Sequence, residues 1–241
     1  MGPFPQPRIR RTMRRMKYKQ LAKFLAHNSF SPLLAMLLAL SSLHAFAGGN
    51  VENGGDGVID GSTVYSLDLV ERGLERSPFV GEDIPVPQEV QTLVDKFLQN
   101  KVPSDTAAIL ARKVARMKAN HEAALYRSVR KVLDSYTLVM IQAPLKIVDD
   151  QDSPIDNRAI TRVAAHSADD QAIQVNLNGF SAMDPQNQAA LLTHEIIYAS
   201  ATDKTSRPSR NIAATLFDPA FKTDSLDVRY RVAQKRFFGQ A

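Results

Sequence analysis

The chain contains no cysteine and no tryptophan among its 241 residues. The absence of cysteine excludes disulfide bonds, thiolate zinc sites, iron–sulfur clusters and thiol nucleophiles. It also excludes attachment to a membrane through a lipidated N-terminal cysteine. An exported protein of this composition needs no oxidative folding, so the redox state of its compartment places no constraint on it.

Acidic residues are missing from the first 47 positions, and this explains the basic character of the whole chain. Eight of the 30 lysines and arginines lie there, and the formal net charge of the full sequence is +5. The remaining residues carry 22 basic and 25 acidic side chains, which gives a net charge of −3. Because the basic excess belongs to the N-terminal segment, we expect no nucleic-acid partner.

The N-terminal segment has the three parts that are typical of a secretory signal peptide. A basic stretch from Arg8 to Lys23 precedes an apolar run at Leu33–Leu40, and the small-x-small sequence Ala45–Ala47 follows. We expect cleavage between Ala47 and Gly48. Residues 1–47 are therefore predicted to be a signal peptide, which implies a periplasmic or secreted protein.

The alternative to a cleaved signal is a membrane anchor. Phe30–Ala47 is 18 residues long and carries no charge, which is near the lower limit for a membrane-spanning helix. The polar sequence Ser41–His44 interrupts the apolar run and leads into the cleavage site. These features favour the signal peptide, with no stable membrane span after cleavage.

The 194 residues after the signal suit one domain with a core of its own. We expect residues 48–86 to form a start rich in glycine and proline with one helix, over residues 62–76. Residues 87–241 are expected to form a single α+β domain. No internal repeat is visible.

Periodic apolar residues predict N-terminal helices, one of them long. The first runs from Pro87 to about Asn100, and the long one from Ser104 to about Asp134. Basic residues occupy the other positions of the long helix, among them Lys113 and Arg116. We expect these residues to form a solvated face around an apolar seam.

The periodicity then changes to that of strands. Tyr136–Ile141 reads as one strand, and Ala159–Ser167 and Gln171–Leu177 read as a hairpin. Helices return after Asp184, a good N-cap residue. Helices followed by a small antiparallel sheet and then C-terminal helices indicate an α+β fold rather than a parallel α/β fold.

The helix after Asp184 is apolar almost all round and should therefore be buried. Between Ala189 and Ala201 the only side chains that are charged or titrate near neutral pH are His194 and Glu195. A buried carboxylate requires a partner, or its pKa rises until it becomes neutral.

The sequence Leu-Leu-Thr-His-Glu-Ile-Ile-Tyr at 191–198 resembles the active-site helix of the zincin metallopeptidases, which carries His-Glu-x-x-His. The resemblance implies that His194 is a zinc ligand and that Glu195 is the catalytic base on a zinc-bound water. Tyr198 replaces the second histidine, and no His or Glu follows Glu195. The implied function is a zincin-like metallohydrolase with an altered or degenerate metal site.

A structural interpretation competes with this one and is preferred. Arg207 and Arg210 follow the helix, and either could fold back onto Glu195 as a hydrogen-bonded ion pair. The His-Glu helix would then be a polar core in a non-catalytic protein without a cofactor.

Short motifs along the chain resemble a family of uncharacterised exported proteins from predatory and related Gram-negative bacteria. They are Gly54-Gly55-Asp56, Leu67–Glu71, and the Leu-x-His-Glu-x-x-Tyr helix with a Ser-Arg after it. The resemblance implies export and no assigned activity. The sequence therefore predicts an exported bacterial envelope protein whose biochemical activity and partners it does not specify.

Overall fold

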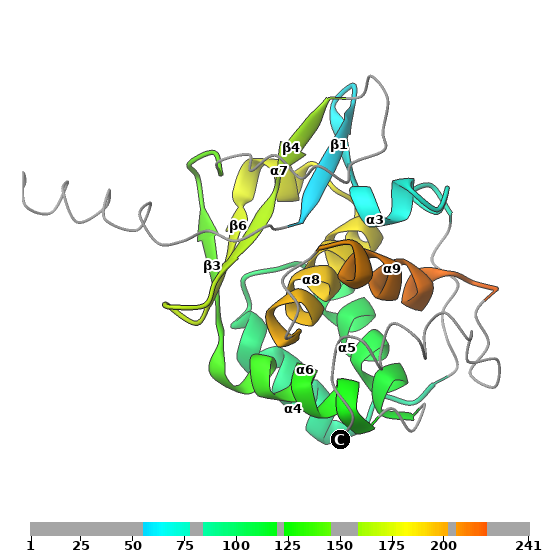
Figure 1. The fold of residues 1–241 in the computed structure, drawn as a ribbon, viewed down its shortest axis with the longest axis vertical. Helices are drawn as coiled ribbons and strands as arrows, with labels where there is room; N and C mark the ends of the chain where they lie inside the picture. The colour runs from blue at the N-terminus through cyan, green and yellow to red at the C-terminus, as the bar shows by residue number, and fades with distance from the viewer. Residues whose placement is uncertain (1–54, 78–83, 120–122, 146–158, 202–205, 221–241) are drawn as a thin grey trace, which may run out of the picture. The chain divides into compact units, whose positions relative to one another are not determined.

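The structure is a computed structural model that describes residues 55–77, 84–119, 123–145, 159–201 and 206–220 (Figure 1). The chain divides into two units, Met1–Gly48 and Gly49–Ala241, and all described residues belong to the second. The predicted signal peptide and its cleavage site at Ala47–Gly48 lie outside the described residues. No helix within the described ranges is long and apolar enough to cross a membrane.

The described elements confirm the predicted α+β class. In chain order they are β1 (Asp56–Asp60), β2 (Thr63–Ser66), α3 (Leu67–Val70), α4 (Gln88–Leu98), α5 (Ser104–Ala119), α6 (Ala123–Ser135), β3 (Thr137–Ile141), β4 (Ile160–Arg162), β5 (Ala164–Ser167), β6 (Ala172–Asn176), α7 (Leu177–Ser181), α8 (Pro185–Ser200) and α9 (Ser206–Phe217).

The helix expected over residues 62–76 is mostly a strand and a turn. Strand β2 pairs antiparallel with β1, and only the four residues of α3 are helical before the turn that follows. Gly61 connects the two strands with φ = +62°, a left-handed conformation that glycine adopts without strain. This turn folds β2 back onto β1, and strand pairing prevails over the helical spacing of the apolar residues.

The strands form two three-stranded sheets, in the orders β2-β1-β4 and β3-β6-β5. The predicted strand at Tyr136–Ile141 and the predicted hairpin are confirmed as β3 and as the antiparallel pair β5–β6. The expectation of a purely antiparallel sheet is wrong, because β3 and β6 run parallel. In this sheet, β6 lies between β5 and β3. Because the hairpin turn reverses the chain, β6 runs opposite to β5 and in the same direction as β3.

Val163 joins the two sheets, because it is the only residue between β4, which belongs to one sheet, and β5, which belongs to the other. The backbone N–H groups of Val163 and Ala164 both donate to the carbonyl oxygen of Gly55, at 3.1 and 3.0 Å. Two successive donors on one acceptor are the mark of a β-bulge, which bends a strand. The bulge carries this strand from one sheet into the other.

The long helix expected from Ser104 to about Asp134 is divided into α5 and α6. The three residues between them, 120–122, lie outside the described residues. Both helices pack against the same 16-residue helix, α8. A straight helix of that predicted length would extend about 46 Å and α8 only about 24 Å. As two separate helices, both halves bury apolar side chains on α8.

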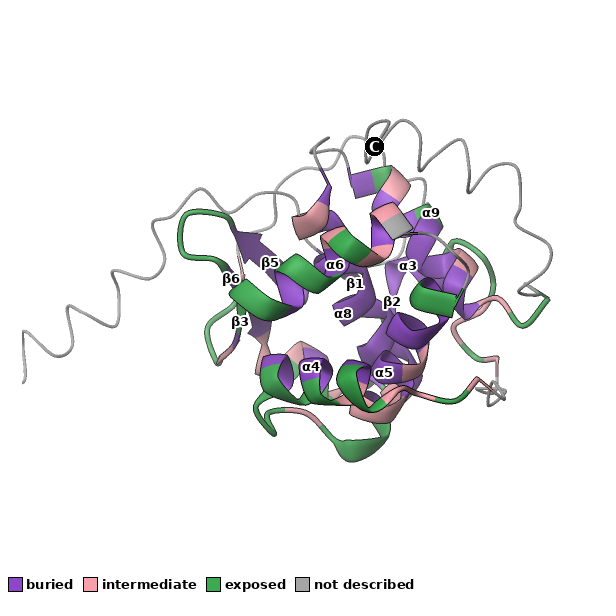
Figure 2. Ribbon diagram, turned by 90° about the horizontal axis from the view of Figure 1, so that it is seen from below, coloured by how far each residue is buried: buried purple, intermediate pink, exposed green. Residues whose placement is uncertain are grey.

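Helix α8 lies at the centre of the packing and is coloured as buried in Figure 2. It contacts α5, α6, α9 and β5. Asp184 caps its N-terminus by accepting a hydrogen bond from the backbone N–H of Asn187 at 2.8 Å, and Pro185 occupies the first turn. Every side chain from Gln186 to Tyr198 is buried, which confirms the expectation from its apolar sequence.

Lys113 and Arg116 on α5 are buried, so the expected solvated face does not include them. Both donate to the carbonyl oxygen of Leu216 in the last turn of α9, at 2.8 Å and 3.1 Å. Carbonyl groups at a helix C-terminus have no partner within the helix and carry partial negative charge, so cations stabilise that end. The two cations therefore fix the end of α9 against α5.

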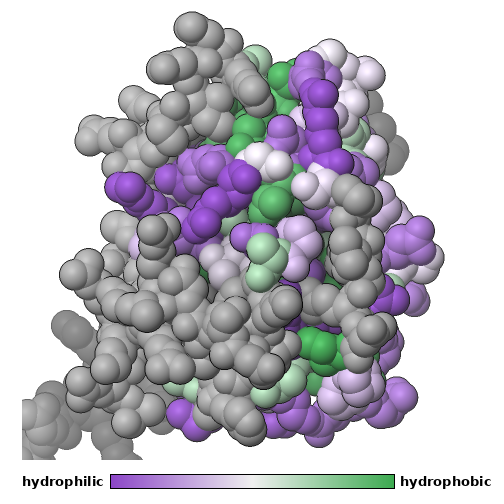
Figure 3. Space-filling view, turned by 90° about the vertical axis from the view of Figure 1, so that its right-hand side faces the viewer, coloured by the Kyte–Doolittle hydropathy of each residue, from purple (hydrophilic) through white to green (hydrophobic). Residues whose placement is uncertain are grey.

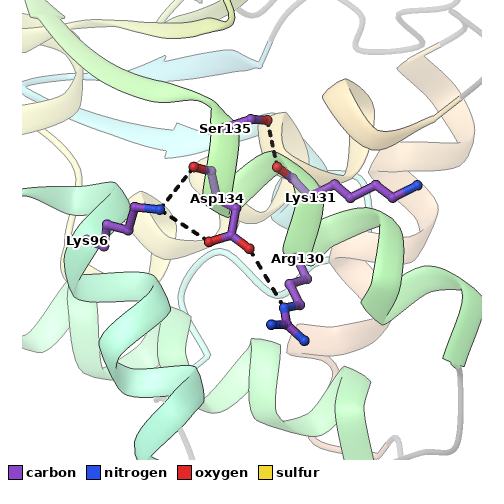
Figure 4. Close-up of polar contacts among 5 residues, drawn as sticks. All are labelled: Lys96, Arg130, Lys131, Asp134 and Ser135. Carbon is purple, nitrogen blue, oxygen red and sulfur yellow. Dashed lines mark hydrogen bonds and ion pairs between the residues drawn. The ribbon is translucent and has the colours of Figure 1, made fainter.

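Other basic residues do lie at the surface, where they pair with acids. Asp134 near the end of α6 binds Lys96 of α4 at 3.3 Å and lies 3.7 Å from Arg130 (Figure 4).

Apolar side chains of the described residues form small groups between polar ones on the face in Figure 3. Ile59 is the large apolar residue that is exposed within the described ranges.

We expect Asp184→Ala to lower the free energy of unfolding by about 1 kcal/mol, because the substitution removes the N-cap of the central helix. Asp134→Ala is the matched control, and it should change the free energy by no more than about 0.5 kcal/mol, since its ion pairs are exposed. Urea unfolding of residues 48–241 measures both values. Equal effects of the two substitutions would contradict the capping role.

Candidate functional site

The only buried side chains of α8 that are charged or titrate near neutral pH are those of His194 and Glu195. Their exposed fractions are 1% and 0%. They lie next to each other on the helix, so they point in directions about 100° apart. His194 meets α3, and Glu195 meets the residue that precedes β1.

His194 forms a hydrogen-bonded ion pair with Asp68 of α3. The imidazole Nδ1 lies 3.0 Å from Asp68 Oδ2, and both side chains are buried. Burial lowers the pKa of His194, but the charge and hydrogen bond of Asp68 outweigh it and raise the pKa to about 8. The other ring nitrogen, Nε2, has no hydrogen-bond partner among the described residues.

Glu195 accepts a short hydrogen bond from the backbone N–H of Gly55 through Oε1. Burial raises the pKa of Glu195 to about 7, against the opposing effects of the His194 charge and the Gly55 hydrogen bond. Its second oxygen, Oε2, is buried and has no partner within the described ranges. The carboxyl group is therefore close to the point of holding a proton at neutral pH.

Gly55 has no side chain where it approaches α8, and the packing requires this. A Cβ at this position would collide with Leu191 Cδ1 and lie 2.8 Å from Glu195 Oε1. The close approach that allows the hydrogen bond is thus available only to glycine.

A second buried ion pair lies beside Glu195. Arg162 Nε of β4 is 3.0 Å from Asp56 Oδ1 of β1, and both side chains are buried. The charge of Arg162 lowers the pKa of Glu195, and the charge of Asp56 raises it by a smaller effect. The arginine that acts electrostatically on Glu195 is therefore one on the sheet.

Of the two arginines expected to pair with Glu195, Arg210 lies close to another glutamate and Arg207 is exposed. Arg210 Nε is 3.7 Å from an oxygen of Glu71, directly after α3. Arg210 also lowers the pKa of His194 by its charge, so it lies near the pair. Its pairing with Glu195 itself stays a prediction.

Tyr198 occupies the position one turn after His194, where a zincin has its second histidine. Its ring stacks on that of His194 with centroids 6.1 Å apart, and it lies nearly perpendicular to the ring of His166 with centroids 5.0 Å apart. His166 on β5 is fully buried. Two buried imidazoles thus contact the ring of one phenol.

The short motifs singled out in the sequence meet at this site. Gly55 and Asp56 come from the glycine-rich start, Asp68 from the stretch Leu67–Glu71, and His194 from the helix motif. Segments that are 126 and 140 residues apart are thereby joined by buried polar contacts. Sequence reasoning identified both helix residues but neither partner. The signal that could have identified Asp68 is its place as an acidic residue within the apolar run Leu67–Val70.

The described residues give limited support for a metal site. Within those ranges no three His, Asp or Glu side chains are close enough to hold a metal ion together. One feature does suit a metal, because a ligating histidine commonly has its second nitrogen bound to a carboxylate. His194 has that arrangement, because its Nδ1 is bound to Asp68 and its Nε2 has no hydrogen-bond partner among the described residues.

Comparison of the chain with protein-family models, with characterised proteins and with solved structures finds no match.

We expect the stability contributed by this site to fall as pH rises from about 4.5 to 8. The folded-state pKa of Glu195 is raised from 4.5 to about 7, and that of His194 from 6.5 to about 8. A group with a raised pKa binds its proton more tightly in the folded protein, so its contribution is lost as pH rises through the folded pKa.

Urea unfolding of wild type and Glu195→Gln at pH 5, 6, 7 and 8 isolates the carboxyl group. The difference in free energy of unfolding, wild type minus variant, should fall between pH 5 and 7 and then level off. A difference that stays constant or rises with pH would contradict the assignment of a raised pKa to Glu195.

Proposed function

We propose that this chain is an exported, non-catalytic protein of the bacterial envelope, in which the His-Glu pair of α8 is a structural polar core. The observation that carries the proposal is that His194 and Glu195 are both fully buried and both bound by residues 55–77, the first described stretch of the chain. A catalytic side chain must be able to contact its substrate, whereas these two side chains are buried and contact other parts of the same chain.

Several polar contacts bind residues 55–77 to α8 and α9. Besides the contacts of His194 and Glu195, the backbone N–H of Ser66 donates to Asn187 Oδ1 at 2.8 Å. The side-chain amide of Asn187 donates in turn to the carbonyl oxygen of Glu75 at 3.0 Å. These hydrogen bonds fix the position of each segment against α8, because each one requires a specific partner, whereas apolar packing does not.

We expect Asp68→Ala to lower the free energy of unfolding by about 3–5 kcal/mol, because the buried imidazole of His194 loses its ion-pair and hydrogen-bond partner. Glu195→Ala should lower it by about 1–3 kcal/mol, because the Gly55 N–H loses its acceptor. Asp60→Ala is the control from the same segment, and the loss of its exposed ion pair with Arg76 should change the value by less than about 1 kcal/mol.

Chemical denaturation of residues 48–241 at pH 7 measures all three variants. Residues kept for activity often reduce stability, so their removal leaves stability unchanged or higher. Unchanged or increased stability of both Asp68→Ala and Glu195→Ala would therefore contradict a structural role and favour a catalytic one.

The export part of the proposal rests on the basic, apolar and small-residue segments of the leader. We expect the full chain, expressed in a Gram-negative host, to yield periplasmic or secreted protein whose first residue is Gly48. Ala47→Phe should block cleavage, because the cleavage site requires small residues. Protein that stays in the membrane fraction with residues 1–47 attached would instead establish the leader as an anchor.

A second candidate is the zincin-like metallohydrolase, with His194 as a ligand and Glu195 as the base. The observation that favours it is His194 Nε2, which is buried and without a hydrogen-bond partner among the described residues. The hydrogen bond from Nδ1 to Asp68 would orient such a ligand.

Elemental analysis of residues 48–241 purified without chelator separates the two candidates. For the structural role we expect zinc far below one ion per chain in wild type and in His194→Gln alike. About one zinc ion per chain in wild type, lost in His194→Gln, would contradict the structural proposal and support the metal site.

A further inference from the structure

We draw no further inference here: the strongest candidate, the cavity of about 500 Å³ between the first turns of α5 and α8, carries nothing because it rests on two helix N-termini, its Arg76 is engaged by Asp60 and its Asp184 by the cap of α8, and no second observation among the described residues points to a ligand.

Discussion

Helix α8 is buried from Gln186 to Tyr198, so bulk water cannot solvate the ionisable side chains of His194 and Glu195. An ion without a partner in such a place costs several kcal/mol, and the fold must supply partners at short range. It supplies them from the start of the domain, through the carboxylate of Asp68 and the backbone of Gly55. The position of residues 55–77 thus depends on the polar groups of a helix more than 120 residues later.

Gly55 connects this helix to the sheets. Its N–H donates to Glu195, and its carbonyl oxygen accepts from both Val163 and Ala164 at the bulge where β4 passes into β5. The ion pair of Asp56 and Arg162 lies directly beside it. Several charged groups gather around α8. The carboxyl groups are those of Asp56, Asp68, Glu71 and Glu195. The cations are Arg162, Arg210 and, when its imidazole is protonated, His194. Burial raises the pKa of two of these carboxyl groups, those of Glu71 and Glu195.

The sequence predicted the elements that local pattern decides and missed those that depend on distant segments. The caps of α8, its burial, strand β3 and the β5–β6 hairpin follow from residues within each element, such as Asp184 and Pro185. Strand β2 was missed because its apolar spacing also fits a helix, and only pairing with β1 decides between the two. The need for a partner at Glu195 was foreseen from burial, whereas Gly55 as that partner was not, because a backbone donor leaves no trace in side-chain chemistry.

A double-mutant cycle between Asp68 and His194 tests most directly whether α8 holds residues 55–77 in place through buried polar contacts. The variants are Asp68→Asn, His194→Gln and the two together, each unfolded in urea at pH 6, where the imidazole of the wild type is charged. The account predicts that the double variant loses about 1–3 kcal/mol less than the sum of the single losses, because either substitution alone breaks the same pair. Losses that add within about 0.5 kcal/mol would contradict it.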